Sequence, residues 1–198
     1  MKSAATIDWL TFTLKMVVDP VAVIKDFLAL DPDLFQSQDF GKFGYRKSMY
    51  FAGIFVYFDP AEGRKMEMGV CVSMTGVGCR TYEQHTRLTA AGTPLRALIE
   101  KIHITDMVHC TRLDLALDDK DKLLDLDRIA DCVESGCVNS RIRKRTIYRG
   151  YDGSDRSGTT VYIGAPSSNF RIRVYDKQRK SINLTMNGII GTGYVLKW

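Results

Sequence analysis

The chain has 198 residues, of which 45% are hydrophobic and 26% charged, and its net charge is +5 at neutral pH. This length suits one domain, or one and a half, and can bury a sizeable core, while the composition excludes a disordered chain. No stretch approaches the ~18 consecutive apolar residues of a membrane span, and no apolar segment follows the N-terminal lysine, so we expect a cytoplasmic protein without membrane contact.

The N-terminal part predicts a strand followed by a helix. Residues 7–14 combine threonine with aromatic side chains of high β propensity and predict the first strand. Asp19 and Pro20 supply an N-cap and a first-turn proline, which predict a helix that runs to Leu28. Residues 40–46 are rich in glycine and aromatic side chains, so we expect a loop or an irregular strand there.

The clearest expected hairpin joins strands at residues 49–58 and 65–74 through residues 59–64. In its second strand, alternate positions are apolar and share one face: Met66, Met68, Val70, Val72 and Met74. This alternation predicts one buried face and one open face.

The rest of the chain predicts helices between groups of antiparallel strands. Helices are expected over residues 95–102, after a proline, and 126–134, where Gly136 ends the helix. The remaining strands are expected at residues 111–118, 142–149, 159–164 and 170–176. The predicted fold class is therefore α+β, an antiparallel sheet with helices on one face.

Carboxylates line one face of the predicted strand at residues 111–118. Its leucines share the other face, and the carboxylate face carries Arg112, Asp114, Ala116 and Asp118. If the leucine face packs on helices, Asp114 and Asp118 lie on the open side of the sheet, where such oxygen ligands suit Mg²⁺ or Mn²⁺. The alternative is that these acids pair with Arg112 and with neighbouring basic strands.

A tyrosine lies in a row of cations on the strand at residues 170–176. Phe170, Ile172 and Val174 point one way, and the opposite face carries Arg171, Arg173, Tyr175 and Lys177. Such cations can hold a phosphate and stabilise charge on its oxygens while the tyrosine attacks it, and arginine suits bidentate phosphate contact. The alternative is an ordinary surface strand.

Positive charge is concentrated around these strands. Residues 139–181 hold eleven Lys or Arg against three Asp, so the remainder of the chain is net negative. This is the charge distribution expected of a phosphate-binding surface, and we expect Arg143, Lys144 and Arg145 to contribute to it. Taken alone, that run would be read as a solvated basic face.

Four short motifs occur in the order found in one protein family: residues 7–13, residues 76–80, residues 112–119, and Tyr162 with Gly164 followed by Arg173-Val174-Tyr175-Asp176-Lys177. The last pair resembles the "YxG…SxxxxRxYDK" signature. The chain thus resembles the replication initiation factor family of rolling-circle plasmid and phage initiators and relaxases of integrative elements.

This resemblance implies a core related to the HUH-nuclease and RRM-like folds, a divalent cation, and a tyrosine that becomes linked to the 5′ phosphate of nicked DNA. By position, Tyr175 is the nucleophile, and Asp114 and Asp118 hold Mg²⁺ or Mn²⁺. Arg171, Arg173 and Lys177 contact phosphate. The implied activity is nicking and strand transfer at a replication or transfer origin, on single-stranded or origin DNA, with a host helicase as a candidate partner.

Two departures from the family pattern are visible. The histidine pair of HUH enzymes is missing, because His85, His103 and His109 are not spaced as alternate strand residues, so carboxylates must replace imidazoles and the histidines are expected to be structural. Family members also continue into a strand with a glutamate, whereas no acidic residue follows Asp176 here. We therefore expect a nicking domain over residues 1–177 and a divergent or truncated segment over residues 178–198.

Two other functions remain open from the sequence. A basic face with Tyr148, Tyr151 and Tyr162 could bind single-stranded DNA by charge and stacking without cleaving it, as a remnant of an initiator. An RNA-binding module of RRM-like architecture is the other, although its aromatic pattern on central strands is missing.

The cysteines do not indicate a metal or disulfide site. Their number is odd and no C-x-x-C pair occurs among Cys71, Cys79, Cys110, Cys132 and Cys137. We expect reduced thiols, mostly in the core.

Overall fold

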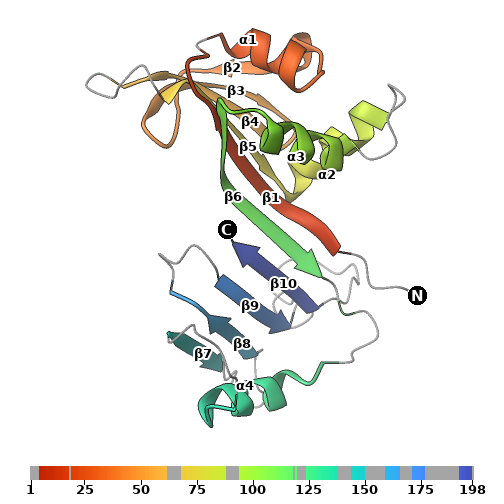
Figure 1. The fold of residues 1–198 in the computed structure, drawn as a ribbon, viewed down its shortest axis with the longest axis vertical. Coiled ribbons are helices and arrows are strands. Elements are labelled where there is room, and N and C mark those ends of the chain that lie inside the picture. The colour runs from red at the N-terminus through yellow and green to blue at the C-terminus, as the bar shows by residue number, and fades with distance from the viewer. Residues whose placement is uncertain are drawn as a thin grey trace. The chain divides into compact units, whose positions relative to one another are not determined.

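The computed structural model describes residues 5–17, 19–61, 68–87, 94–117, 119, 124–137, 144–149, 159–165, 171–176 and 192–197. By its internal contacts the chain divides into two compact units, Ile7–Leu113 on one hand and Met1–Thr6 with Asp114–Trp198 on the other (Figure 1). We call them the first and the second unit and describe each by itself.

The first unit is a mixed sheet-and-helix structure. Its strands are β1 (Ala5–Leu14), β2 (Gln36–Gln38), β3 (Tyr45–Phe51), β4 (Ile54–Pro60), β5 (Val70–Thr75) and β6 (Val108–Leu117), in the order β2-β3-β4-β5-β1-β6. Its helices are α1 (Pro20–Ala22), the π-helical η1 (Val23–Phe27), the 3-10 helix η2 (Pro32–Leu34), α2 (Gly76–Arg87) and α3 (Pro94–Ile104). The helix expected after Asp19 is confirmed, since the Asp19 carboxylate accepts a hydrogen bond from the Val21 amide.

The core of the first unit lies between one face of this sheet and its helices. Alternate residues of β1, namely Leu10, Phe12 and Leu14, point into it. Helical residues meet them from η1, α2 and α3, including Ile24, Tyr82 and Leu98. The buried side chains of β4 and β5 complete the cluster, so the helices pack on a single face of this sheet.

The strand predicted at residues 49–58 is wrong, because the structure divides it into β3 and β4. The two strands are joined by a tight turn at Ala52 and Gly53, whose φ angles of 39° and 89° are both positive. Turns of this kind match the twist of a hairpin. An added Cβ at Gly53 would meet the Gly78 amide nitrogen at 2.6 Å, so the close approach of α2 also requires glycine there. Ala52 and Gly53 are poor strand formers, but the aromatic and apolar residues on both sides of them led to the prediction of one strand.

The expectation that the strand at residues 65–74 has one buried and one open face is correct only in part. Val70, Val72 and Met74 share a fully buried face, as predicted. The other face is also buried, with Ser73 at 1% exposure, because β5 is an inner strand between β4 and β1. The Ser73 and Thr11 hydroxyls lie 3.0 Å apart and hydrogen-bond there, while Cys71 packs under aromatic rings of β3 and β4.

In its described residues, the second unit is a smaller sheet covered by one helix. Its strands are β7 (Arg145–Arg149), β8 (Thr159–Ile163), β9 (Arg171–Asp176) and β10 (Thr192–Lys197), and with the end of β6 they follow the order β6-β10-β9-β8-β7. Its helix, α4 (Leu126–Glu134), has the predicted bounds and is capped by Asp125, which accepts a hydrogen bond from the Arg128 amide. Ala130 and Val133 pack on Val161, Ile163 and Val174 of the sheet.

The expected meander of β7, β8 and β9 is present, and β10 is an addition that the sequence did not predict. β10 pairs antiparallel with both β9 and β6. Part of residues 178–198, the segment expected to be divergent or truncated, therefore forms a strand of this sheet. The boundary expected after residue 177 lies outside the described residues, so the division into 1–177 and 178–198 stays a prediction.

The predicted α+β class is confirmed: every strand pairing with a defined register is antiparallel, and in each unit helices cover one sheet face. None of the helices in the described part of the chain has the length and apolarity of a membrane span.

Candidate nucleic-acid interface

The two faces of β9 differ in chemistry. Ile172 and Val174 pack into the apolar cluster under α4, and Val174 is only 4% exposed. Because side chains alternate along a strand, Arg171, Arg173 and Tyr175 lie on the face turned away from α4. The predicted alternation of this strand is confirmed. We call this surface, with Tyr162 of β8, the arginine–tyrosine face.

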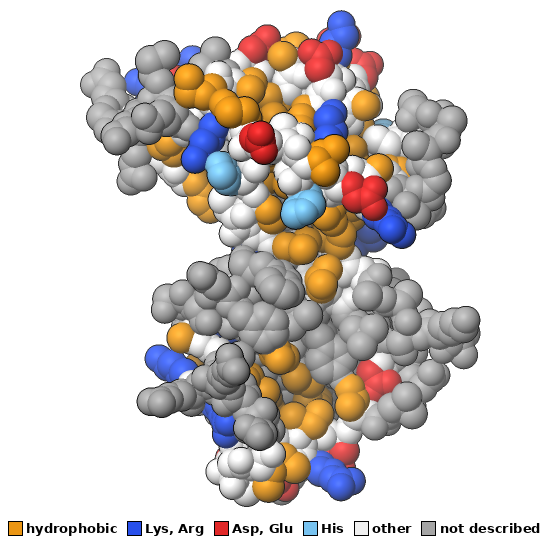
Figure 2. Space-filling model, viewed as in Figure 1, with side chains coloured by type: hydrophobic (Ala, Val, Ile, Leu, Met, Phe, Trp, Pro, Cys, Tyr) orange, Lys and Arg blue, Asp and Glu red, His pale blue; other side chains and the backbone are white. Residues whose placement is uncertain are grey.

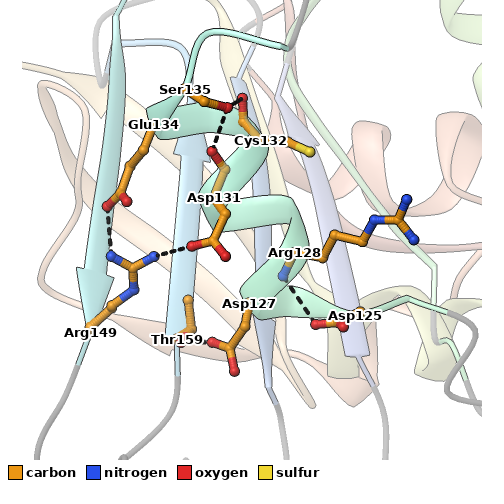
Figure 3. A network of polar contacts seen from close by, with 9 residues as sticks. All are labelled: Asp125, Asp127, Arg128, Asp131, Cys132, Glu134, Ser135, Arg149 and Thr159. Carbon is orange, nitrogen blue, oxygen red and sulfur yellow. Dashed lines mark hydrogen bonds and ion pairs between the residues drawn. The ribbon is translucent and has the colours of Figure 1, made fainter.

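The face covered by α4 is closed by ion pairs (Figure 3). Arg149 of β7 contacts Asp131 at 3.0 Å and Glu134 at 2.6 Å, and Thr159 of β8 donates to the Asp127 carboxylate at 3.2 Å. The hydrogen bond with Glu134 raises the pKa of Arg149, so this cation is held by acids of α4. The opposite face is therefore the one available to a phosphate backbone.

Cations and rings alternate across the arginine–tyrosine face. The guanidinium carbon of Arg171 lies 4.0 Å from the centre of the Tyr162 ring. That of Arg173 lies 5.5 Å from the centre of Tyr162 and 4.4 Å from the centre of Tyr175. Cation–π contacts of this kind contribute about 0.5–1 kcal/mol each at exposed sites and fix the guanidinium planes. Both arginines are thereby held in place before any ligand arrives.

The same arginines have unused donors. The Nε atoms of Arg171 and Arg173 are buried, and no described residue accepts a hydrogen bond from them. A buried donor without an acceptor typically costs ~1–3 kcal/mol. A guanidinium stacked on a ring still directs its N–H groups outward in its own plane, in the geometry that suits phosphate oxygens. An anion is the ligand that this face fits.

The structure brings together some of the predicted phosphate contacts and not others. Arg171 and Arg173 share a strand face with Tyr175, and Arg173 contacts its ring. Lys144 is exposed at the start of β7. Arg145 pairs with Ile163, whose side chain is in the cluster under α4. Since paired residues share a face, Arg145 lies on the side of α4 and not on the arginine–tyrosine face. Arg143 and Lys177 lie outside the described residues.

The expectation that Asp114 points to open solvent is wrong. Asp114 is 3% exposed, whereas the leucines beside it, Leu113 and Leu115, are only half-buried. β10, which was not expected, runs alongside β6 with Lys197 opposite Asp114 in the register. β6 is thus paired on this side and is not an edge strand. Asp118 lies outside the described residues.

A resident metal ion is not accounted for by the described residues alone. Among them, no group of three or more His, Cys, Asp or Glu side chains could hold an ion. Asp114 shares a row with Arg171 in the register, not with Tyr175. From strand spacings its Cα is roughly 10 Å across and 13 Å along the sheet from that of Tyr175. Of the two predicted ligands only Asp114 is described, and its carboxylate alone does not form a site for a divalent ion.

Three other tyrosines are unsuited to attack a phosphate. Tyr45, Tyr57 and Tyr82 are buried in the first unit, and burial raises the pKa of each to about 12. Tyr175 lies on a partly exposed strand face, with Arg173 over its ring.

The first unit holds a stacked pair that sequence reasoning missed. Arg112 of β6 lies 4.2 Å from the centre of the Trp9 ring, and the Trp9 indole donates to the Thr11 hydroxyl at 2.9 Å. Both residues fall in motifs recognised as family features, which was the available signal. On the side seen in Figure 2, acidic and basic side chains of this unit are interspersed.

The histidines are scattered in the first unit. His85 packs edge-on against Phe51, with ring centres 5.0 Å apart, as a structural residue would. His103 and His109 are exposed.

Comparison with known proteins identifies the class to which this antiparallel sheet, with a tyrosine and arginines on one face, belongs. Residues 4–94 match the rolling circle replication initiation protein N-terminal domain, and residues 108–187 match the replication initiation factor family. The chain belongs to the replication initiation factor family.

Two relatives illustrate this membership. A protein of Bacillus subtilis (strain 168) named "Putative DNA relaxase NicK" is 26% identical over an alignment of 164 residues that covers 78% of this chain and 43% of that protein. The chain therefore matches less than half of that relative's length. The structure of a rolling circle replication initiator protein from Geobacillus stearothermophilus is similar with a TM-score of 0.78 and 27% identity, over 99% of this chain and 74% of that one.

Proposed function

We propose that this protein nicks one strand of DNA with Tyr175 as the nucleophile and initiates rolling-circle replication or transfer from the nick. The observation that carries the proposal is the position of Arg173, 4.4 Å from the Tyr175 ring, on the face where the Nε atoms of Arg171 and Arg173 have no acceptor among the described residues. The names of the relatives, a relaxase and a rolling-circle initiator, support it.

In the proposed reaction, the Tyr175 oxygen attacks the phosphorus of a phosphodiester. A new bond joins this oxygen to the 5′ phosphate of the downstream strand, and the bond to the 3′ oxygen of the upstream strand breaks. The phenol gives up its proton and the leaving oxygen takes one up, so a free 3′-OH remains to prime synthesis. Arg171 and Arg173 would orient the phosphate and stabilise charge on its non-bridging oxygens.

We propose that Asp114 and Asp118 hold Mg²⁺ or Mn²⁺ when DNA is bound. When bound, such an ion would neutralise charge on the scissile phosphate. Because the described residues supply only one of these carboxylates, the steps above depend on the protein's own side chains. Lys177, Arg143 and Lys144 remain proposed contacts to the DNA backbone beyond the scissile phosphate, whereas Arg145 would contact only a strand that also reaches the face under α4.

The proposed substrate is single-stranded or extruded origin DNA, and a host helicase is the proposed partner after nicking. A second candidate function is binding of single-stranded DNA without cleavage. It is favoured by the burial of Asp114 and by its distance from Tyr175 in the register.

A covalent adduct separates these functions. A randomised pool of single-stranded oligonucleotides with a 3′ label is incubated with the protein and Mn²⁺ and resolved under denaturing conditions. We expect labelled protein from the wild type and none from Tyr175→Phe. The matched control is Tyr162→Phe on the same face, which should keep the adduct. An adduct formed by Tyr175→Phe, or none formed by the wild type, would exclude the nicking proposal.

A further inference from the structure

Tyr148 of β7 is an aromatic side chain that the proposed reaction does not use. It is 60% exposed, and its ring stands at 90° to that of Tyr162, with the ring centres 5.7 Å apart. Among the described residues of the second unit, Leu124 is the other large hydrophobic side chain with comparable exposure. Tyr148 thus offers a ring to a ligand from a position that is itself held by Tyr162.

The sheet register places Tyr148 in the same row as the proposed nucleophile. Tyr148 pairs with Thr160, and Thr160 pairs with Tyr175. Because directly paired residues lie on one face and neighbouring strands are ~4.8 Å apart, the Cα atoms of Tyr148 and Tyr175 are roughly 10 Å apart. The small Thr160 lies between them. One nucleotide can bridge this separation from its phosphate to its base.

We infer that Tyr148 is a base-stacking residue, and that it receives an unpaired base of the strand whose phosphate is held by Arg171 and Arg173. The inference deepens the proposed function and rests on it only in that the arginine–tyrosine face binds DNA. Stacking on a tyrosine ring tolerates any base, since every base has a π face, but it requires that face to be exposed. Tyr148 therefore makes the site selective for single-stranded over paired DNA.

Two probes of equal charge test this role without knowledge of the origin sequence. One is a fluorescein-labelled thymidine 12-mer, and the other is a 12-mer of abasic tetrahydrofuran units with the same phosphates. Binding is measured in the Tyr175→Phe background without metal, so that cleavage plays no part. Tyr148→Ala should weaken binding of the thymidine probe about fivefold or more and leave the abasic probe unchanged. Tyr148→Phe, which keeps the ring, should bind both probes as its parent does.

The matched control is Phe40→Ala, which removes an aromatic side chain of similar exposure, 54%, from the first unit and should not change either affinity. Equal losses on both probes, no loss on either, or a loss in Tyr148→Phe as large as in Tyr148→Ala would each overturn the inference. If Tyr148→Ala does not fold, photocrosslinking of the full-length wild type to a 5-iododeoxyuridine 12-mer decides, because a stacked base must crosslink to the peptide that contains Tyr148. Absence of that crosslink overturns the inference. The nicking proposal is unaffected by these results, since its test is the covalent adduct.

Discussion

The guanidinium carbon of Arg173 lies 4.4 Å from the centre of the Tyr175 ring, two residues further along the same strand face. This contact places Arg173, which would hold the scissile phosphate, next to Tyr175, the proposed nucleophile. It also means that charge and shape at residue 173 can be tested separately.

Arg173→Lys keeps the positive charge but removes the planar group that stacks on Tyr175 and Tyr162. We expect nicking to fall about 100-fold, the usual effect of removing one well-placed donor, while DNA binding changes little. Initial nicking rates and anisotropy titrations measure the two effects. The matched change Arg149→Lys, on the face under α4, should leave the nicking rate unchanged. Equal rates for Arg173→Lys and the wild type would contradict the role given to Arg173.

Binding of single-stranded DNA should depend strongly on salt. If about four phosphates are neutralised, the log–log slope of affinity against salt concentration is near −3, and each lost contact removes ~0.7 from it. Arg171→Ala should therefore flatten the slope by ~0.7, whereas Arg149→Ala should not, because Arg149 is held by Asp131 and Glu134. A slope that Arg171→Ala leaves unaltered would remove this residue from the DNA surface.

Asp114→Asn should affect both stability and metal use. Because Asp114 is buried, we expect its replacement to lower the free energy of unfolding by ~1–3 kcal/mol, contrary to the small effect expected of an exposed carboxylate. As a proposed ligand, it should also be needed for Mn²⁺-supported nicking. Urea unfolding and nicking at several Mn²⁺ concentrations measure these effects, with the exposed Asp106→Asn as control. Normal nicking by a folded Asp114→Asn protein would show that the ion binds elsewhere.

The cysteines should react in two groups. Burial raises the pKa of the Cys71 thiol to about 11 and that of Cys79 to about 12, so at pH 8 roughly one molecule in a thousand or fewer carries the reactive thiolate. Cys110 and Cys137 are exposed, which corrects the expectation that most cysteines lie in the core. Alkylation of the native protein, followed by peptide mass spectrometry, should label the exposed pair and spare the buried pair until the chain is unfolded. Early labelling of Cys71 would contradict the buried position of β5.

The sequence predicted elements whose signals are local. The bounds of α4 follow from its Asp125 cap and the glycine after it, and the faces of β9 follow from strict alternation. Features that depend on distant partners were missed. The pairing of β6 with β10 was missed because it joins residues about eighty positions apart in the chain. One local feature was missed as well, the hairpin turn at Ala52 and Gly53, because the residues on both sides of it are strong strand formers.

For the candidate site, the sequence predicted the alternation of side chains along one strand but not the contacts between neighbouring strands. Period-two spacing placed Arg171, Arg173 and Tyr175 on one face, and the structure confirms it. The spacing could not show that Tyr162 of the neighbouring strand lies under the arginines, since this depends on the register between β8 and β9. It also could not separate Arg145 from this face, because the pairing with Ile163 decides that position.

The most direct test of the account is to find the residue that carries DNA after cleavage. Wild-type protein is incubated with the randomised oligonucleotide pool, now biotinylated at the 3′ end, in the presence of Mn²⁺, and the adduct is captured under denaturing conditions. After digestion with trypsin and a nuclease, mass spectrometry locates the modified residue. The account predicts a 5′-phosphonucleotide on Tyr175. A modification on Tyr148, Tyr162 or any other residue, or the absence of an adduct, would contradict it.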